Sequence, residues 1–422
     1  MNKRRVVLAY SGGLDTSVAV HWLGKERGYE VIALALDVGQ PGTDLEAIAA
    51  RARAAGAVEV VVVDARSELA EDFVLPSLQA NALYEGRYPL VSALSRPVIA
   101  RHLVATARRL GAGAVAHGCT GKGNDQVRFE VGTRALAPDL DIVAPVREWG
   151  MTREESIAYA ERFGVPVTAS RERIYSIDEN LWGRAIECGV IEDPWASPPP
   201  DVFALTSPPA GRPVEAVEVV LGFEAGRPTS LDGEGLDLVD LIGRLQSIAG
   251  SRGFGRIDLV ENRRVGIKSR EIYEAPAALA LVMAHQDLES LTLEREVAHE
   301  KARLEPRLAE LVYDGMWFSP LREALSAFVT STQRHVTGEV RLRFSPGGAA
   351  AVAGRRSPVG LYDYGLATYD AADAFRHQDA EGFVRIYGLG IATWASRQGP
   401  AGASSGPEGA AGPKGAAGAA PR

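Results

Sequence analysis

The chain has 422 residues and a mass of 44.9 kDa. This length exceeds what one hydrophobic core usually supports, so we expect two domains. A formal net charge of −8 disfavours a protein whose main role is to bind the backbone of a nucleic acid. The two cysteines, Cys119 and Cys188, are too few for a disulfide framework or a structural zinc site, so a reduced, cytoplasmic setting is expected.

The N-terminus does not resemble a targeting segment. Its apolar run, residues 6–9, ends at Tyr10-Ser11-Gly12-Gly13 and is shorter than the roughly 7–15 apolar residues of a signal peptide. The longest apolar stretch elsewhere, residues 275–284, covers about half of a membrane span. We therefore expect a soluble protein without a membrane partner.

The first 150 residues alternate between short apolar runs and helical patterns. The runs, rich in Val and Ile, cover residues 6–10, 31–36, 58–63, 114–116 and 142–146. Helical patterns cover residues 16–27, 44–55 and 98–110. This alternation predicts an α/β fold with a parallel sheet that helices cover on both faces. Ligands of such sheets bind beyond the carboxyl ends of the strands, so motifs at those ends are candidates for function.

The rest of the chain is predicted to form a second, α+β domain. Residues 194–213 are rich in Pro, Ser and Ala, as is typical of a connection. Residues 214–223 and 339–344 alternate like antiparallel strands, and one long helical pattern covers residues 275–314. We place the first domain at residues 1–172 and the second at 173–378. Residues 399–422, nearly all Gly, Ala, Pro and Ser, are expected to form a disordered tail.

The strongest motif is Ala9-Tyr10-Ser11-Gly12-Gly13-Leu14-Asp15-Thr16-Ser17, between the first predicted strand and the first helix. Its two glycines allow a tight turn that exposes backbone N–H groups, and its hydroxyls and the helix N-terminus add further donors. This combination predicts a cradle for phosphate oxygens. The carboxylate of Asp15 would repel a phosphate unless a cation lies between them, and Mg²⁺ is the natural candidate. No lysine followed by Ser or Thr is present in the motif, so it is not the loop of kinases and GTPases.

A second cluster follows the fourth predicted strand and reads His117-Gly118-Cys119-Thr120-Gly121-Lys122-Gly123-Asn124-Asp125-Gln126-Val127-Arg128-Phe129-Glu130. It combines a hydroxyl, a carboxamide, a carboxylate and a guanidinium among three glycines. Such a set can bind a zwitterion, with donors for its carboxylate and acceptors for its ammonium group. Because both motifs follow strands of one sheet, we expect this cluster to form a substrate wall beside the phosphate cradle.

The Ser-Gly-Gly-x-Asp motif resembles the pyrophosphate-binding loop of the N-type ATP pyrophosphatases, which adenylate a carbonyl-type oxygen and release pyrophosphate. Together with the second cluster, it resembles the argininosuccinate synthase family. Further matching blocks are Tyr84-Glu85-Gly86-Arg87-Tyr88, Ser176-Ile177-Asp178-Glu179-Asn180-Leu181, Arg256-Ile257-Asp258-Leu259-Val260-Glu261-Asn262-Arg263, Lys268-Ser269-Arg270 and Ile272-Tyr273-Glu274. The resemblance extends over about residues 5–390.

This resemblance implies an ATP- and Mg²⁺-dependent ligase that joins citrulline and aspartate through a citrullyl-adenylate. The products would be argininosuccinate, AMP and pyrophosphate, in arginine biosynthesis and the urea cycle. The implied ATP-binding residues are Ala9, Tyr10, Ser11, Gly12, Gly13, Leu14, Asp15, Thr16, Ser17, Leu36 and Gly118. The implied citrulline-binding residues are Tyr88, Asn124, Arg128, Ser176, Glu261 and Tyr273, and the implied aspartate-binding residues are Thr120, Asn124 and Asp125. Asp15, as the metal ligand, Asn124 and Arg128 are the implied catalytic residues.

Three positions depart from the family pattern. Family members commonly have citrulline-binding serines where this chain has Ala93 and Ala185, and a small residue where it has Leu36. We expect altered citrulline contacts rather than lost activity. No residue is an obvious general base for the amine of aspartate, and His117 is assigned no role.

The resemblance also implies how the chain assembles. Residues 173–378 would be the synthetase and multimerisation domain, and residues 379–398 an arm that reaches across a homotetramer. Three other functions are alternatives: a tRNA-modifying enzyme with the same loop, an amidotransferase-type synthetase, and a non-enzymatic nucleotide-binding module. The acidic charge disfavours the tRNA-modifying enzyme. The amidotransferase is disfavoured because no Cys/His nucleophile module is apparent, and the binding module because the second domain is long and has polar blocks.

Overall fold

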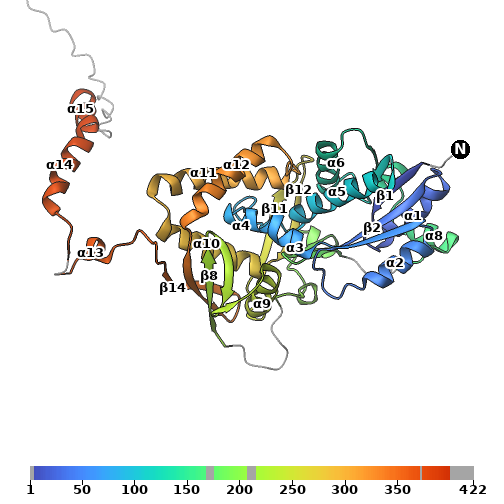
Figure 1. Cartoon of the computed structure of the whole chain (residues 1–422), viewed down its shortest axis with the longest axis horizontal. Helices are drawn as coiled ribbons and strands as arrows, with labels where there is room; N and C mark the ends of the chain where they lie inside the picture. The colour runs from blue at the N-terminus through green and yellow to red at the C-terminus, as the bar shows by residue number, and fades with distance from the viewer. Residues whose placement is uncertain (1–3, 168–174, 207–214, 371–372, 400–422) are drawn as a thin grey trace, which may run out of the picture. The chain divides into compact units, whose positions relative to one another are not determined.

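The computed structural model describes residues 4–167, 175–206, 215–370 and 373–399 (Figure 1). The chain divides into two compact units, of which the first ends at Leu361 and the second begins at Tyr362. The predicted boundaries at residues 172 and 378 remain predictions. None of the helices in the described ranges is both long enough and apolar enough to cross a membrane.

A five-stranded parallel sheet forms the N-terminal part of the first unit, which confirms the α/β prediction. Its strands are β1 (Arg5–Ala9), β2 (Glu30–Asp37), β3 (Glu59–Asp64), β4 (Ala114–Ala116) and β5 (Asp141–Val143). They lie in the order β3-β2-β1-β4-β5, and every neighbouring pair is parallel. The chain therefore reverses its direction of winding between β1 and β4, and the carboxyl ends of these two strands form the switch point where such sheets bind ligands.

Helices connect or follow these strands and cover both faces of the sheet. They are α1 (Leu14–Lys25), α2 (Leu45–Ala54), α3 (Arg66–Glu68), the π-helix η1 (Leu69–Val74), α4 (Leu75–Gln79), α5 (Val91–Leu110), α6 (Asp125–Leu136), α7 (Pro145–Trp149) and α8 (Arg153–Phe163). Two sequence predictions were wrong at their ends. The strand predicted to reach residue 146 stops at Val143, because Pro145 occupies the first position of α7. The helix predicted over residues 98–110 begins earlier, at Val91, and continues through Pro97.

Alternate residues of each strand point to opposite faces, so the sheet is buried on both sides. Val7 and Ile32 pack on the face that α5 covers, in the larger hydrophobic core. Val6 and Val31 pack on the opposite face with side chains of α1 and α8. In Figure 1, α5 lies on one side of β1 and β2 while α2 and α8 lie on the other. This burial explains why the strands read as continuous apolar runs.

Two antiparallel sheets form the rest of the first unit. One has the order β11-β12-β7-β6, and its strands are β6 (Ser176–Asn180), β7 (Gly183–Glu187), β11 (Arg256–Asn262) and β12 (Lys268–Glu274). The other has the order β10-β9-β8-β13-β14, and its strands are β8 (Val217–Glu224), β9 (Arg227–Leu231), β10 (Glu234–Gly235), β13 (Gly338–Ser345) and β14 (Ala349–Arg356). Strands β8 and β13 confirm the two predicted strands, although residue 214 lies outside the described residues, as does 207–213 of the predicted connection.

Helices pack around these two sheets. They are η2 (Gly189–Glu192), η3 (Pro200–Val202), α9 (Leu238–Gly250), α10 (Pro276–Thr292), α11 (Arg295–Tyr313), α12 (Pro320–Thr332) and η4 (Gln333–His335). The long helix predicted over residues 275–314 is in fact two, α10 and α11. Glu294 has extended backbone and accepts the N–H groups of Glu296 and Val297, so its side chain caps a new helix and ends the old one.

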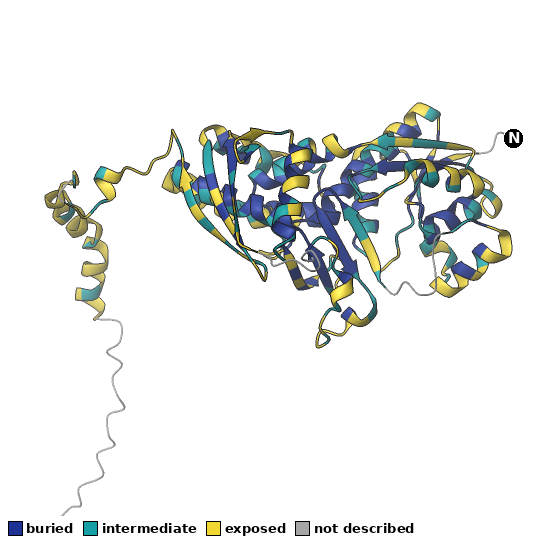
Figure 2. Cartoon of the chain, turned by 90° about the horizontal axis from the view of Figure 1, so that it is seen from below, coloured by how far each residue is buried: buried dark blue, intermediate teal, exposed yellow. Residues whose placement is uncertain are grey.

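The second unit contains α13 (Tyr364–Ala367), α14 (His377–Tyr387) and α15 (Leu389–Gln398). None of the residues in these helices is buried. Figure 2 shows α14 and α15 as exposed along almost their whole length. The exposed apolar side chains of this pair are Phe383, Val384, Ile386, Tyr387, Leu389, Ile391 and Trp394. Residues 400–422 of the predicted tail lie outside the described residues.

A buried polar cluster ties the N-terminal part of the first unit to α10 and α11. Lys301 is 1% exposed and donates to the carboxylates of Glu289 and Glu305. The amide of Asn81, which follows α4, donates to the same two carboxylates. His285 lies between Asn81 and a glutamine of η4. Because every charge in the cluster has an opposite partner, its burial is tolerated only while the cluster is complete.

We therefore predict that Lys301→Met destabilises the fold strongly. Removing one partner of a buried ion pair leaves the other charge buried alone, and we expect the free energy of unfolding to fall by about 3 kcal/mol. The measurement is urea unfolding of the whole chain. Arg303→Met, an exposed change on the same helix, is the control and should cost less than about 0.5 kcal/mol. Equal effects of the two substitutions would contradict the prediction.

Candidate active site

The predicted phosphate loop connects β1 to α1 at the switch point of the parallel sheet. Gly12 has φ +77°, a left-handed conformation that favours glycine. Gly13 precedes α1, and no side chain caps the first turn of that helix. The hydroxyls of Ser11 and Thr16 lie 3.1 Å apart across the loop. The loop therefore combines free N–H groups of a helix start with two hydroxyls, as a phosphate cradle requires.

Several predicted ATP-binding residues form the base of this loop. Tyr10 and Ser17 are buried, and their hydroxyls lie 3.0 Å apart. Leu14 and Leu36 are buried apolar side chains, and Ala9 packs against the larger core. These side chains lie on the side of the loop that faces the protein interior, whereas Ser11 is exposed.

Asp15 is the acidic residue of the loop, and its surroundings suit a metal ion that is held jointly by a carboxylate and by phosphate groups. It makes no hydrogen bond to the described residues, and burial raises its pKa, with the charge of Arg153 opposing this shift. No group of three or more His, Cys, Asp or Glu that could hold a metal occurs within the described part of the chain. Mg²⁺ is commonly held by one or two carboxylates together with substrate phosphates, so a single carboxylate here fits Mg²⁺ with ATP.

The second motif follows β4 and lies directly beside the phosphate loop. A Cβ atom on Gly118 would lie only 3.0 Å from the methyl group of Thr16, so the two loops are in close contact. His117 is buried, and its Nδ1 accepts the N–H of Cys119 at 3.2 Å while its Nε2 faces Glu130. The histidine thus holds the loop in shape. Burial raises the pKa of the Cys119 thiol, which makes it a poor nucleophile.

This second loop leads into a cavity of about 490 Å³, part of which is open to solvent. The cavity is lined by Tyr88, Ser92, Gly123, Asn124, Asp125, Arg128, Ser176, Asp178, Ala185, Glu187, Glu261, Arg263, Glu271 and Tyr273. All six residues predicted to bind citrulline are among them, as are two of the three predicted to bind aspartate. The third, Thr120, is exposed on the loop and does not line the cavity.

One face of the β11-β12-β7-β6 sheet forms a wall of the cavity. In the register of this sheet, Tyr273 pairs with Ala185, which in turn pairs with Asp178. Residues two apart along a strand share a face, so Ser176, Asp178, Ala185, Glu187, Glu261, Glu271 and Tyr273 lie on one side. Residues from four separate sequence blocks are brought together by this alternation.

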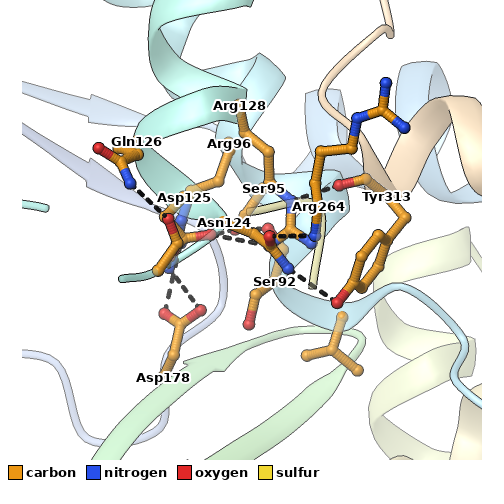
Figure 3. Close-up of polar contacts among 12 residues, drawn as sticks. Ser92, Ser95, Arg96, Asn124, Asp125, Gln126, Arg128, Asp178, Arg264 and Tyr313 are labelled. Carbon is orange, nitrogen blue, oxygen red and sulfur yellow. Dashed lines mark hydrogen bonds and ion pairs between the residues drawn. The ribbon is translucent and has the colours of Figure 1, made fainter. Parts of the chain in front are cut away.

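A buried carboxylate, Glu261, lies at the centre of the hydrogen bonds in this wall. It accepts the hydroxyl of Tyr273 at 2.7 Å and that of Tyr313 at 2.5 Å. The amide of Asn124 donates to the Tyr313 hydroxyl at 2.7 Å, and its oxygen accepts the N–H of Arg264 (Figure 3). Burial raises the pKa of Glu261, while the two hydroxyls lower it. The loop after β4 is thereby fixed to the sheet and to the end of α11.

A chain of ion pairs also lines the cavity and reaches the same wall at Asp178. Arg128 donates to Asp125 at 2.8 Å, and Arg96 donates to both Asp125 and Asp178 at 2.7 Å (Figure 3). The two guanidinium groups hold the pKa of Asp125 at about 2 despite its burial. Arg128 also donates from Nε to the carbonyl of Tyr313. Asp125 is therefore a firmly ionised acceptor and a weak base.

Sequence reasoning missed several residues of this site. Tyr313 ends α11 without any motif around it, and Arg96 lies on α5 outside every block that we singled out. Ser92 lines the cavity and donates its N–H to the hydroxyl of Tyr88, whereas Ala93 beside it is buried and does not line the cavity. Of these residues, only Ser92 had a signal in the sequence, because it is the neighbour of Ala93, where family members commonly have a serine.

The cavity is richer in carboxylates than in cations. Its lining includes five acidic side chains and two arginines. Glu271 is buried, and burial together with Glu187 and Glu261 raises its pKa, although Arg263 donates to both Glu187 and Glu271. Such surroundings favour a ligand that brings an ammonium group.

Comparison with known proteins gives a consistent result over both parts of the chain. A family model described as the Arginosuccinate synthase N-terminal HUP domain matches residues 5–166, and one described as the Arginosuccinate synthase C-terminal domain matches residues 175–394. A relative named Argininosuccinate synthase, from Symbiobacterium thermophilum, is 57% identical over 398 residues, covering 94% of this chain and 99% of the relative. Another of that name, from Oceanobacillus iheyensis, is 55% identical over 405 residues, covering 96% and 97%.

Among solved structures, a U34-tRNA thiolase NcsA from Methanococcus maripaludis with its [4Fe-4S] cluster is 16% identical, with a TM-score of 0.27. The match covers 40% of this chain and 61% of the thiolase chain, and so low a TM-score supports no conclusion. The matches to the two family models and to the full-length relatives agree with the resemblance noted in the sequence. The chain belongs to the argininosuccinate synthase family.

Proposed function

We propose that this chain catalyses the ATP-dependent condensation of citrulline and aspartate to argininosuccinate, AMP and pyrophosphate. As a ligase of its family, it uses ATP to form a C–N bond in arginine biosynthesis. The observation that carries the proposal is the placing of Tyr88, Asn124, Arg128, Ser176, Glu261 and Tyr273 around one cavity beside the phosphate loop. Two loops that touch at Gly118 and Thr16 hold the two ligand regions within reach of one another.

The chemistry requires that a poor nucleophile and a poor electrophile be brought together. The ureido oxygen of citrulline attacks the α-phosphorus of ATP, and the bond to the departing pyrophosphate breaks. The amine of aspartate then attacks the ureido carbon and displaces AMP. Positioning of the three substrates in one cleft supplies a large part of the rate enhancement.

The cavity offers groups for both ends of a zwitterionic amino acid. Nη2 of Arg128 makes no hydrogen bond to the described residues, so it remains available for the carboxylate of citrulline. Each oxygen of Glu261 accepts only one hydroxyl and can also accept an N–H of the ammonium group. Ser92 is the side-chain hydroxyl nearest in sequence to the missing serine at Ala93, and we assign it the contact that this serine would make.

Asn124 and Asp125 begin α6 and are assigned to aspartate, together with Thr120 on the loop before them. Asp125 is a weak base, because two guanidinium groups stabilise its charge. We therefore assign the proton of the aspartate amine to a phosphate oxygen of the intermediate rather than to a side chain.

Mg²⁺ is part of the proposal, with Asp15 as its protein ligand. When bound, Mg²⁺ neutralises charge on the phosphates and on the departing pyrophosphate. The chain itself supplies the N–H groups of the loop, the hydroxyls of Ser11 and Thr16, and one carboxylate that has no other partner among the described residues.

A homotetramer and a cytoplasmic setting complete the proposal. The apolar side chains of α14 and α15 are exposed in the single chain, and burial of such side chains against another copy would stabilise an assembly. Both cysteines are free thiols, which is in keeping with a reducing compartment.

The reaction itself is tested by pyrophosphate release from Mg-ATP, with citrulline and aspartate supplied singly and together. The citrulline carries heavy oxygen at the ureido group. We expect release to depend on citrulline and the label to appear in AMP, because the ureido oxygen becomes bonded to phosphorus. Release that is independent of citrulline would return the substrate assignment to the other adenylating enzymes, and no release at all would favour a binding module.

For the metal ligand, we predict that Asp15→Asn lowers Mg-dependent turnover by about a hundredfold or more. Because burial raises the pKa of Asp15, the charged form is disfavoured in the folded state, so this neutral substitution should not lower thermal stability. Asp44→Asn, which keeps a good cap for α2, is the matched control and should leave turnover unchanged. Wild-type turnover in Asp15→Asn would refute the metal role.

The role of the arm is tested by ending the chain at Gly382. We expect sedimentation to show species smaller than those of the whole chain, because the truncation removes the exposed apolar side chains of α14 and α15. A chain ending at Gly399 is the control, since it lacks only the tail. An unchanged tetramer after truncation at Gly382 would rule out the arm as the assembling element.

A further inference from the structure

Arg51 lies against the phosphate loop although it belongs to none of the motifs. It is on α2, the helix that follows the neighbouring strand β2. A Cβ atom on Gly12 would lie 3.0 Å from Nη2 of Arg51, so the guanidinium touches the first glycine of the loop. Burial raises the pKa of Tyr10, and the charge of Arg51 opposes this shift. The side chain thus reaches the loop from a separate element.

Within the part of the chain that the structure describes, the charge of Arg51 has no opposite partner. Within the described residues, Arg51, Arg96 and Arg101 have a buried Nε that makes neither a hydrogen bond nor an ion pair. Arg96 and Arg101 pair with carboxylates through their remaining nitrogens. Arg51 makes no ion pair with any described residue, and it is the one of the three that lies at the candidate nucleotide site.

A partly buried guanidinium without a counter-charge is costly, and an anion at the site removes that cost. The loop that Arg51 touches has the N–H groups and hydroxyls of a phosphate cradle. A guanidinium remains charged throughout a reaction and matches the oxygens of a phosphate with two parallel donors. A phosphate group is therefore the ligand that completes the surroundings of Arg51.

We propose that Arg51 binds the β- and γ-phosphates of ATP and stabilises the pyrophosphate as it leaves; this inference rests on the proposed function. Leu36 and Gly118, the other residues assigned to ATP, lie outside the loop, whereas Arg51 contacts the loop itself. When the ureido oxygen bonds to the α-phosphorus, the bond from that phosphorus to the α,β-bridging oxygen breaks. Its electron pair stays on that oxygen, and the negative charge grows on the pyrophosphate beside Arg51.

The test is calorimetric binding of magnesium pyrophosphate and, separately, of AMP to the whole chain. We expect Arg51→Met to bind pyrophosphate about 10- to 100-fold more weakly, as for the loss of one charge-assisted contact, and AMP as the wild type does. Arg51→Lys keeps the charge and should recover part of the pyrophosphate affinity. Arg53→Met, an exposed arginine on the same helix, is the control and should leave both affinities unchanged.

The same variants are compared in steady-state turnover, where Arg51→Met should also lower kcat. If Arg51→Met binds pyrophosphate as the wild type does, the inference about Arg51 is overturned and the proposed function stands. A variant that loses affinity only for AMP would have the same consequence. Thermal unfolding shows whether each variant folds. If Arg51→Met does not fold, the pyrophosphate affinity of Arg51→Lys tests the proposal. A wild-type chain that releases no pyrophosphate with citrulline present would instead overturn the proposed function, and this inference with it.

Discussion

The site depends on one buried carboxylate, Glu261, and on the two tyrosine hydroxyls that hold it. Tyr273 comes from the neighbouring strand, but Tyr313 comes from the end of a helix about fifty residues later in the chain. Burial makes an isolated carboxylate costly, so the folded chain must keep both hydroxyls in place. The Tyr313 hydroxyl is also the acceptor for Asn124, and this contact fixes the start of α6. A single carboxylate thus aligns two sides of the cavity, while its free lone pairs remain for a ligand.

The ion pairs of the cavity follow a different principle. There the charges compensate one another directly, through the chain from Arg128 to Asp125, Arg96 and Asp178. Asp178 lies on β6 and Arg96 on α5, so this chain also joins the antiparallel sheet to the parallel-sheet part of the unit. A strongly ionised Asp125 is suited to orienting an amine by accepting its hydrogen bonds, not to removing a proton from it. The site therefore acts by positioning and electrostatics more than by side-chain acid–base chemistry.

Local patterns predicted the elements whose causes are local. The phosphate loop was readable because glycines, hydroxyls and a helix start are adjacent in sequence, and the parallel sheet because its strands are apolar on both faces. The break between α10 and α11 was missed, because a glutamate as cap is not distinguishable from one in a helix. Tyr313, Arg96 and Arg51 could not be found, because each reaches the site through packing between distant elements rather than through its neighbours in sequence.

The two ligand regions are coupled through one short segment, residues 118–124. It begins where Gly118 packs closely against Thr16 of the phosphate loop, so that a Cβ atom there would lie 3.0 Å from the threonine methyl group. It ends at Asn124, which the Tyr313 hydroxyl and the N–H of Arg264 hold in place. In between, the carbonyl of Lys122 accepts from Arg263, another residue of the cavity. Under the proposed function, this segment joins the nucleotide region to the cavity assigned to the amino acids. Such a connection would let the fold set the distance between phosphorus and ureido oxygen, which is the quantity that a reaction driven by proximity requires.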